Sequence, residues 1–267
     1  MTDRPLILLT NDDGIEAPGL AALAAAMRDL GEIAIVAPRH EMSATGHAIS
    51  IKRIHSLRPF YRDGALFGHG FEGSPADCVK FAISRFLGRQ PDLVVSGINP
   101  GPNFGNNIPY SGTVAAALEG AMYGVAAMAV STGRPDAGAS ADFGPAARIA
   151  VRLARIVLKD GLAPGVALNL NVPLRPESQI KGLRVARQGG FRVIDRFDPI
   201  EAGEDGAPCY SNMGFEWVHS AGGDLTDDRA FMQGWAAVTP IQYDLTAREE
   251  LERWRLLLEH GRIHEPE

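Results

Sequence analysis

Two adjacent carboxylates, Asp12 and Asp13, are the residues of this sequence best suited to do chemistry. They end the stretch LILLTNDDG (6–14), in which an apolar run stops abruptly on an asparagine and two aspartates. Neighbouring carboxylates repel each other, and a bound divalent cation or a shared proton relieves that repulsion. The pair therefore indicates a metal site or a proton-sharing site. The alternative is that both aspartates only cap the next helix and form a turn before Gly14.

Further oxygen-bearing side chains follow two other apolar runs. The run 33–38 leads into APRHEMSATG (37–46), and the run 91–97 leads into SGINPGPNFGNN (96–107), two loops with serine and asparagine side chains. In open parallel sheets, ligands bind beyond the carboxyl ends of the strands, so we expect these loops to share one crevice with the aspartates. Carboxylate, amide and hydroxyl oxygens without a convincing His or Cys partner suit magnesium, manganese or calcium.

The segment IPYSGTVAAALEGA (108–121) predicts a phosphate site. Ser111 and Thr113 lie where a helix begins, and Gly112 between them lets the backbone come close to a ligand. The first amides of a helix have no partner within it, so they can bind phosphate oxygens. Ser-Gly-Thr also fits an ordinary helix cap, and the phosphate interpretation therefore depends on the neighbouring aspartates.

The elements that must position these residues alternate between strands and helices. Apolar runs predict buried strands at 6–10, 33–38, 91–97 and 165–173, and helical spacing of apolar residues predicts helices at 18–31, 77–87 and 143–161. The segment 113–131 predicts a helix that runs on toward another buried strand. Such alternation is typical of a parallel sheet covered on both faces. We therefore expect an α/β, Rossmann-like fold with a mostly parallel sheet covered by helices. The motif GHGFEG (68–73) lies far from the first strand, and we do not interpret it as a dinucleotide fingerprint.

The chain changes character after Pro173. The segments 182–198 and 214–220 resemble hairpin strands, 234–246 resembles another strand, and 247–260 resembles a final helix. These segments offer too little apolar surface for a core of their own. We therefore expect a Rossmann-like catalytic core over 1–181 and a C-terminal β-hairpin arm and helix over 182–267. The extension would pack on the core or be exchanged between subunits of a homodimer or homotetramer.

Composition excludes several classes of function. A net charge of −6 provides no overall basic surface, so we expect no nucleic-acid polymer as partner. Cys78 and Cys209 form no metal-like pair, which indicates reduced thiols. The first five residues show no signal-peptide pattern, and no apolar stretch approaches the roughly 20 residues that span a bilayer. We expect a cytoplasmic protein without a membrane partner.

Five segments together resemble the SurE family, the stationary-phase survival proteins that act as metal-dependent 5'-nucleotidases. They are LLTNDDG, APRHEMSATGHAISI, GSPADCVKFAI, PDLVVSGINPGPNFGNNIPYSGTVAAALEGA and TDDRAFMQGWAAVTPIQYDLT. The similarity covers nearly the whole chain in matching order. Ser74 stands where the family has threonine, which keeps a hydroxyl cap. The loop 199–222 fits the family only loosely, which leaves the substrate preference open.

The resemblance also implies which residues form the site. One divalent cation per subunit, Mg²⁺ or Mn²⁺ with Ca²⁺ as a substitute in a crystal, would be held by Asp12, Asp13, Ser43 and Asn99. The phosphate would be surrounded by Asn103, Ser111, Gly112 and Thr113. The substrate would be a nucleoside 5'-monophosphate.

The residue patterns predict hydrolysis of phosphate monoesters by metal-activated water, and the resemblance implies that the substrates are nucleoside 5'-monophosphates, cleaved to nucleoside and phosphate. One of the two aspartates could also act as general base, and the sequence does not distinguish Asp12 from Asp13. Two other hypotheses are a covalent aspartyl phosphatase, although such sites have DxD rather than adjacent carboxylates, and a module that binds nucleotide without cleaving it. Phosphate release from AMP with and without manganese separates the enzyme from the module.

Overall fold

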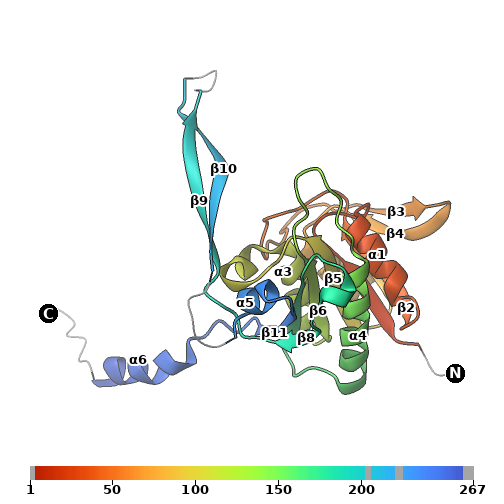
Figure 1. Cartoon of the computed structure of the whole chain (residues 1–267). Coiled ribbons are helices and arrows are strands. Elements are labelled where there is room, and N and C mark those ends of the chain that lie inside the picture. The colour runs from red at the N-terminus through yellow and green to blue at the C-terminus, as the bar shows by residue number, and fades with distance from the viewer. Residues whose placement is uncertain (1–3, 202–205, 220–224, 261–267) are drawn as a thin grey trace.

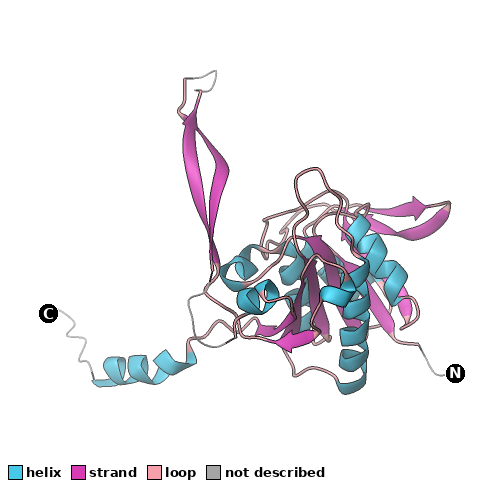
Figure 2. Ribbon diagram, in the orientation of Figure 1, coloured by secondary structure: helices cyan, strands magenta, loops and turns pink. Residues whose placement is uncertain are grey.

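The computed structural model describes residues 4–201, 206–219 and 225–260, and Figures 1 and 2 show how its elements are arranged. Its strands over these residues are β1 (Leu6–Thr10), β2 (Glu32–Pro38), β3 (Leu57–Arg62), β4 (Ala65–Phe71), β5 (Leu93–Pro100), β6 (Ala127–Thr132), β7 (Val166–Val172), β8 (Leu183–Val185), β9 (Arg192–Ile200), β10 (Cys209–Val218) and β11 (Ala236–Gln242). Its helices are α1 (Pro18–Met27), α2 (Pro75–Phe81), α3 (Gly112–Met122), α4 (Gly144–Asp160), α5 (Asp227–Met232) and α6 (Arg248–His260). Shorter helical turns are η1 (Ala82–Phe86), η2 (Gly105–Tyr110) and η3 (Glu177–Gln179).

A mostly parallel sheet forms the centre of the molecule. Nine strands of the described chain lie in it, in the order β3-β4-β2-β1-β5-β6-β7-β11-β8. Its antiparallel pairs are β3 with β4 and β11 with β7, whereas the other neighbouring strands run parallel. This arrangement confirms the predicted α/β class.

Helices cover both faces of the sheet. The helices α1 and α4 pack on one face, and α2 and α3 pack on the other. Strand β1 shows why its sequence is apolar throughout: Ile7 and Leu9 belong to the core under α1 and α4, while Leu8 belongs to the core under α2 and α3. Because side chains alternate along a strand, burial on both faces requires an unbroken apolar run. The polar residues that follow β1 therefore lie at the sheet edge.

The glycines of GHGFEG belong to a strand and not to a nucleotide loop. Gly68 and Gly70 lie in β4, which forms an unpredicted hairpin with β3. A Cβ at Gly68 would lie 2.5 Å from Cβ of Ile35, so this glycine allows β2 and β4 to pack closely. The following helix α2 begins as predicted, since Ser74 and Asp77 form a reciprocal capping box.

The C-terminal segment both extends the sheet and projects from it. Strand β11 pairs with β7 and β8, so the segment after residue 181 contributes to the central sheet. The predicted 182–198 strand is instead divided into β8 and β9. Strands β9 and β10 form an antiparallel ribbon, called the arm below, which rises from the body in Figure 1, while α6 extends to one side. Residue 220 of the predicted second hairpin strand lies outside the described residues. The domain boundary at 181 stays a prediction.

Both cysteines are free thiols, as predicted: Cys78 is buried and Cys209 is partly exposed. In the three ranges that the structure describes, no helix combines the length and apolar character needed to cross a membrane.

Candidate active site

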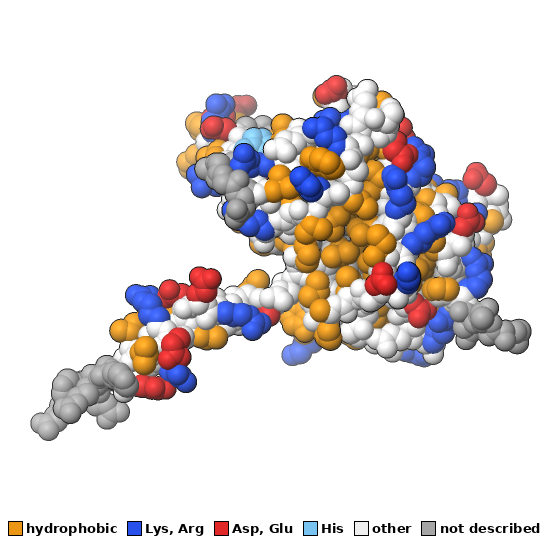
Figure 3. Space-filling model, turned by 60° about the horizontal axis from the view of Figure 1, so that its bottom comes forward, with side chains coloured by type: hydrophobic (Ala, Val, Ile, Leu, Met, Phe, Trp, Pro, Cys, Tyr) orange, Lys and Arg blue, Asp and Glu red, His pale blue; other side chains and the backbone are white. Residues whose placement is uncertain are grey.

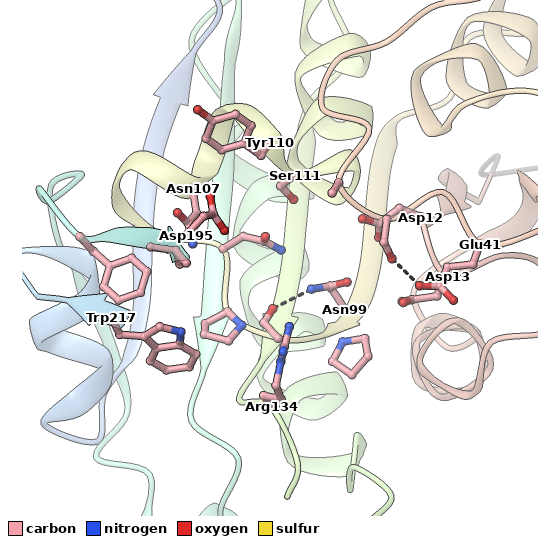
Figure 4. Close-up of a pocket in the computed structure, with 18 of the residues that line it drawn as sticks. Asp12, Asp13, Glu41, Asn99, Asn107, Tyr110, Ser111, Arg134, Asp195 and Trp217 are labelled. Atoms are coloured by element: carbon pink, nitrogen blue, oxygen red, sulfur yellow. Dashed lines mark hydrogen bonds between the residues drawn. The ribbon is translucent and has the colours of Figure 1, made fainter. Parts of the chain in front are cut away.

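A pocket of about 710 Å³ opens at the carboxyl ends of β1 and β5, which pair in parallel through Thr10 and Ser96. It brings together most of the residues singled out in the sequence. Its lining includes Asp12, Asp13, Ser43, Asn99, Asn103 and Ser111. In Figure 4 the two aspartates lie at one end of the pocket, Asn99 lies near its middle and Trp217 lies at the other end. Gly112 and Thr113 do not line the pocket but lie directly behind Asp12.

The turn after β1 is built by Asn11 and not by the aspartates. The side chain of Asn11 accepts a hydrogen bond from N of Gly14 at 3.2 Å and donates one to its carbonyl oxygen at 2.9 Å. Gly14 has a φ of +100°, which favours glycine. The N-cap of α1 is Ala17, without a side-chain hydrogen bond. A helix cap therefore does not explain Asp12 and Asp13.

Asp12 is held from behind by the start of α3. The hydroxyl of the buried Thr113 donates a hydrogen bond to Oδ1 of Asp12 at 2.5 Å. A Cβ at Gly112 would lie 2.9 Å from Cβ of Asp12, so only glycine allows this close contact without a shift. The carbonyl oxygen of Asp12 also accepts a hydrogen bond from N of Met42 at 2.7 Å, which attaches the loop after β2.

Asp13 carries an acceptor without a partner. Its Oδ2 is buried and accepts no hydrogen bond from the residues that the structure describes. Burial, followed by the charges of Asp12 and Glu41, raises the pKa of Asp13 to about 7. Burial also raises the pKa of Asp12, although the hydrogen bond from Thr113 opposes this shift. The pair is therefore costly to ionise unless a positive charge lies beside it.

Ser43 and Asn99 bring further oxygen atoms to the lining of the same pocket. The hydroxyl of Ser43 donates to Oε1 of Glu41 at 2.6 Å in the exposed loop after β2. Nδ2 of Asn99 donates to the carbonyl oxygen of Gly101 at 2.7 Å, so its amide oxygen is the atom left for another partner. Figure 4 shows that oxygen on the side of Asp13.

The loop of Ser43 is anchored to α3 by a charged contact. Nε2 of His47 lies 2.7 Å from Oε2 of the buried Glu119, and Nζ of Lys80 lies 3.3 Å from Oε1 of the same carboxylate. These contacts hold the pKa of Glu119 below its usual value despite its burial. His47 therefore fastens the loop that carries Ser43, and it does not line the pocket.

Asn103 and Ser111 occupy the predicted phosphate side of the pocket. Backbone N of Asn103 donates to Oδ1 of Asn171 at 2.7 Å, and its Nδ2 donates to Oγ of Ser131 at 2.9 Å. The hydroxyl of Ser111 accepts from N of Val114 at 3.1 Å and caps α3. The first turn of α3 therefore begins beside the pocket, with the carboxylate of Asp12 next to its N-terminus.

The late part of the chain also supports this edge of the pocket. The buried carboxylate of Asp227, at the start of α5, accepts hydrogen bonds from N of Gly105 and N of Gly189, both at 2.9 Å. Burial raises the pKa of Asp227, and these backbone donors oppose the shift. The contact fixes the turn η2 between Asn103 and Ser111.

Comparison with known proteins identifies the architecture. The family described as "Survival protein SurE" matches residues 7–195, which is more than half of the chain. The chain belongs to the SurE family. The 5'-nucleotidase SurE of Syntrophobacter fumaroxidans is 41% identical, with 94% of this chain and 99% of that protein covered. The 5'-nucleotidase SurE of Chloroflexus aggregans is 44% identical, with 93% and 98% covered. The crystal structure of the SurE protein from Aquifex aeolicus matches this chain with a TM-score of 0.80 at 33% identity. The match covers 95% of this chain and 100% of the Aquifex chain.

Several pocket residues of this SurE chain were not found from its sequence. Arg134 follows β6 by two residues and lines the pocket, although no motif indicated an arginine. The rule that ligands bind at strand ends could have found it. The other missed residues come from the loop after β2, from η2 and from the arm: Glu41, Asn107, Tyr110, Phe191, Val193, Asp195, Asn212 and Trp217. No local sequence signal places the arm residues there.

Proposed function

We propose that this chain is a divalent-metal-dependent phosphomonoesterase that hydrolyses nucleoside 5'-monophosphates to nucleoside and phosphate. The observation that carries the proposal is the adjacent carboxylates of buried Asp12 and half-buried Asp13, facing a nucleotide-sized pocket beside the N-terminus of α3. The names of the relatives, which describe 5'-nucleotidases, support the same activity.

The residues at the aspartate end fit a divalent cation. Oδ2 of Asp13 is buried without a hydrogen-bond donor, and the pKa of both carboxyls is raised in the absence of a positive charge. The described residues contain no group of three or more His, Cys, Asp or Glu suited to a metal, so amide and hydroxyl oxygens would have to complete the ligand set. Asn99 and Ser43 supply them. Such hard oxygen ligands suit Mg²⁺ or Mn²⁺.

The bound cation would supply a Lewis acid and would lower the pKa of a water molecule at this end of the pocket. The hydrogen bond from Thr113 would orient the carboxylate of Asp12. Asp13 is our candidate for the general base, because the carboxylate of Asp12 is already bonded to Thr113. One carboxylate oxygen of Asp13 would face the cation, and the other would accept the proton of the attacking water.

The opposite side of the reacting phosphate would be held by α3 and its neighbours. Ser111 and Asn103, which line the pocket, would donate hydrogen bonds to the equatorial phosphate oxygens. Arg134, exposed in the same pocket, would add a positive charge. The nucleoside would then extend toward the arm.

Phosphate release from AMP tests the proposal. Protein dialysed against EDTA should be inactive, and added Mn²⁺ or Mg²⁺ should restore turnover. Full activity of the dialysed protein would contradict the metal requirement. Manganese-dependent AMP binding without phosphate release would favour the non-hydrolytic module. Phosphate retained on acid-quenched protein would favour the covalent aspartyl mechanism.

A further inference from the structure

The arm forms the end of the pocket that lies farthest from the aspartates in Figure 4. Phe191 precedes β9, while Val193 and Asp195 come from β9, and Asn212 and Trp217 come from β10. If phosphate binds at the aspartate end, the nucleoside must occupy the space toward these residues. The chemistry of the arm then decides which base is accepted.

Trp217 gives this end of the pocket a flat apolar surface. Its ring meets the ring of Phe191 edge to face, with centroids 5.8 Å apart and an interplanar angle of 82°. Phe191 is buried and packs in the same way on Phe104, at 4.6 Å. Trp217 is thus supported from the core, while 40% of its surface stays exposed. An exposed indole in a pocket is suited to stack on a planar base.

Asp195 and Asn212 bring hydrogen-bond acceptors to the same end of the pocket as this indole. Asp195 pairs with residue 215 in the ladder, and Asn212 lies in the irregularity between Ser211 and Gly214. Such bulges redirect side chains, and here Nδ2 of Asn212 donates to Oδ1 of Asp195 at 3.3 Å. This bond uses an amide donor and one lone pair of Oδ1 of Asp195, so both carboxylate oxygens of Asp195 and Oδ1 of Asn212 can still accept hydrogen bonds. The arm therefore offers an edge rich in acceptors.

We propose that the arm end of the pocket is a guanine site, in which Trp217 stacks on the base and Asp195 with Asn212 accepts its edge. Guanine presents two neighbouring donors, N1–H and the 2-amino group, which match a carboxylate in a bidentate way. Hypoxanthine has the same shape but lacks the 2-amino group. Adenine places a ring acceptor beside its amino group, which would face the carboxylate. The inference rests on the proposed phosphomonoesterase function.

Steady-state kinetics with Mn²⁺ on GMP, IMP and ribose 5-phosphate test the guanine site. We expect kcat/KM for GMP to exceed that for IMP by about tenfold or more, as for one hydrogen bond to a charged acceptor. Asp195→Asn keeps the shape but presents a donor, so the GMP-to-IMP ratio should fall toward one. Its loss of activity on ribose 5-phosphate, which has no base, should be smaller than its loss on GMP.

Two further variants complete the test. Asp198→Asn removes a carboxylate from the same strand outside the pocket lining, where it pairs with Arg196, and should keep the wild-type ratio. Trp217→Ala should raise KM for both nucleotides more than for ribose 5-phosphate, and Trp217→Phe should retain most of the affinity. A wild-type GMP-to-IMP ratio near one, or an unchanged ratio in Asp195→Asn, would overturn the guanine site. Failure to release phosphate from any of the three substrates would instead overturn the proposed function.

Discussion

Oγ1 of Thr113 lies 2.5 Å from Oδ1 of Asp12, although the two residues are 101 positions apart in the chain. The contact joins the loop after β1 to the first turn of α3. The position of Thr113 at a helix start suggests a helix cap or a phosphate ligand, whereas its hydroxyl donates a hydrogen bond to Asp12. Its hydroxyl is buried against a carboxylate, so its first effect is on the orientation of Asp12.

Thr113→Val should therefore weaken metal binding. The change keeps the shape of the side chain and removes the donor to Asp12, and loss of such an outer partner typically lowers metal affinity by about 10- to 100-fold. Thr113→Ser keeps the donor and should bind Mn²⁺ nearly as well as the parent. Calorimetric titration with Mn²⁺ checks both variants. Equal affinity in Thr113→Val would show that the contact does not support the metal site.

Asp12→Asn and Asp13→Asn should lose Mn²⁺ affinity and AMP turnover together. Each change removes one negative charge from the proposed ligand set and keeps the shape of the side chain. Turnover of Asp13→Asn should fall by about 10²-fold or more, the usual range for loss of a general base, and turnover of Asp12→Asn should fall with its Mn²⁺ affinity. Circular dichroism should show that both variants remain folded. Parent-like Mn²⁺ binding in both variants would contradict the assignment of the pair as metal ligands.

The stability of the metal-free protein should depend on pH through Asp13. The pKa of Asp13 is about 7 in the folded chain, compared with a reference value of 3.8 that stands for the unfolded chain. Between about pH 4 and pH 7 the folded state therefore binds more protons than the unfolded state. Stability from this group is therefore present at low pH and is lost as the pH rises through 7, with a slope of up to about 1.4 kcal/mol per pH unit. Thermal unfolding in EDTA from pH 5 to 8 should show a smaller decrease for Asp13→Asn than for the parent. Identical pH profiles would contradict the raised pKa.

Metal binding should show the opposite pH dependence. Protons and Mn²⁺ compete for Asp13, so the apparent Mn²⁺ affinity should fall by roughly tenfold per pH unit as the pH decreases below about 7. Titrations at pH 6, 7 and 8 measure this slope. A pH-independent affinity would show that Asp13 carries no proton in the metal-free protein.

We expect a homodimer or homotetramer in solution, because α6 leaves apolar side chains without cover. Five of them are exposed, namely Leu251, Trp254, Leu256, Leu257 and Leu258. Figure 3 also shows hydrophobic side chains gathered on the face of the body next to the C-terminal extension. Burial of such surface is a common reason for exchange between identical subunits.

Light scattering at micromolar concentration tests this expectation. The double variant Leu251→Asp with Leu258→Asp should shift the mass toward the monomer, whereas Glu249→Gln on the same helix should not. A monomeric parent protein would contradict the prediction.

The aspartate end of the pocket could be predicted from sequence because its residues follow buried strands. An unbroken apolar run such as 6–10 has to end at the sheet edge, so Asp12 and Asp13 could be placed there without coordinates. The direction of a side chain is not contained in that pattern. Thr113 turns toward Asp12 instead of the pocket, and Asn11 takes over the turn that the aspartates could have made.

The arm end could not be predicted in this way. Asp195 and Trp217 lie in a ribbon that rises from the body, and no short motif encodes where that ribbon stands relative to the pocket. The hairpin of β3 and β4 was missed because Gly68 and Gly70 weaken the strand pattern. In the structure Gly68 packs against β2, and Gly70 packs against the loop that follows β2.

The bond between Asp227 and Gly105 sets an order of events during protein synthesis. Asp12 leaves the ribosome early, but the carboxylate that holds the η2 turn is made 122 residues after the glycine it anchors. Until then the amide of Gly105 lacks its native acceptor, and β7 lacks its neighbour β11. A nascent chain that ends before Asp227 therefore carries the aspartate pair without a finished pocket, so turnover should begin only when synthesis of the chain is nearly complete.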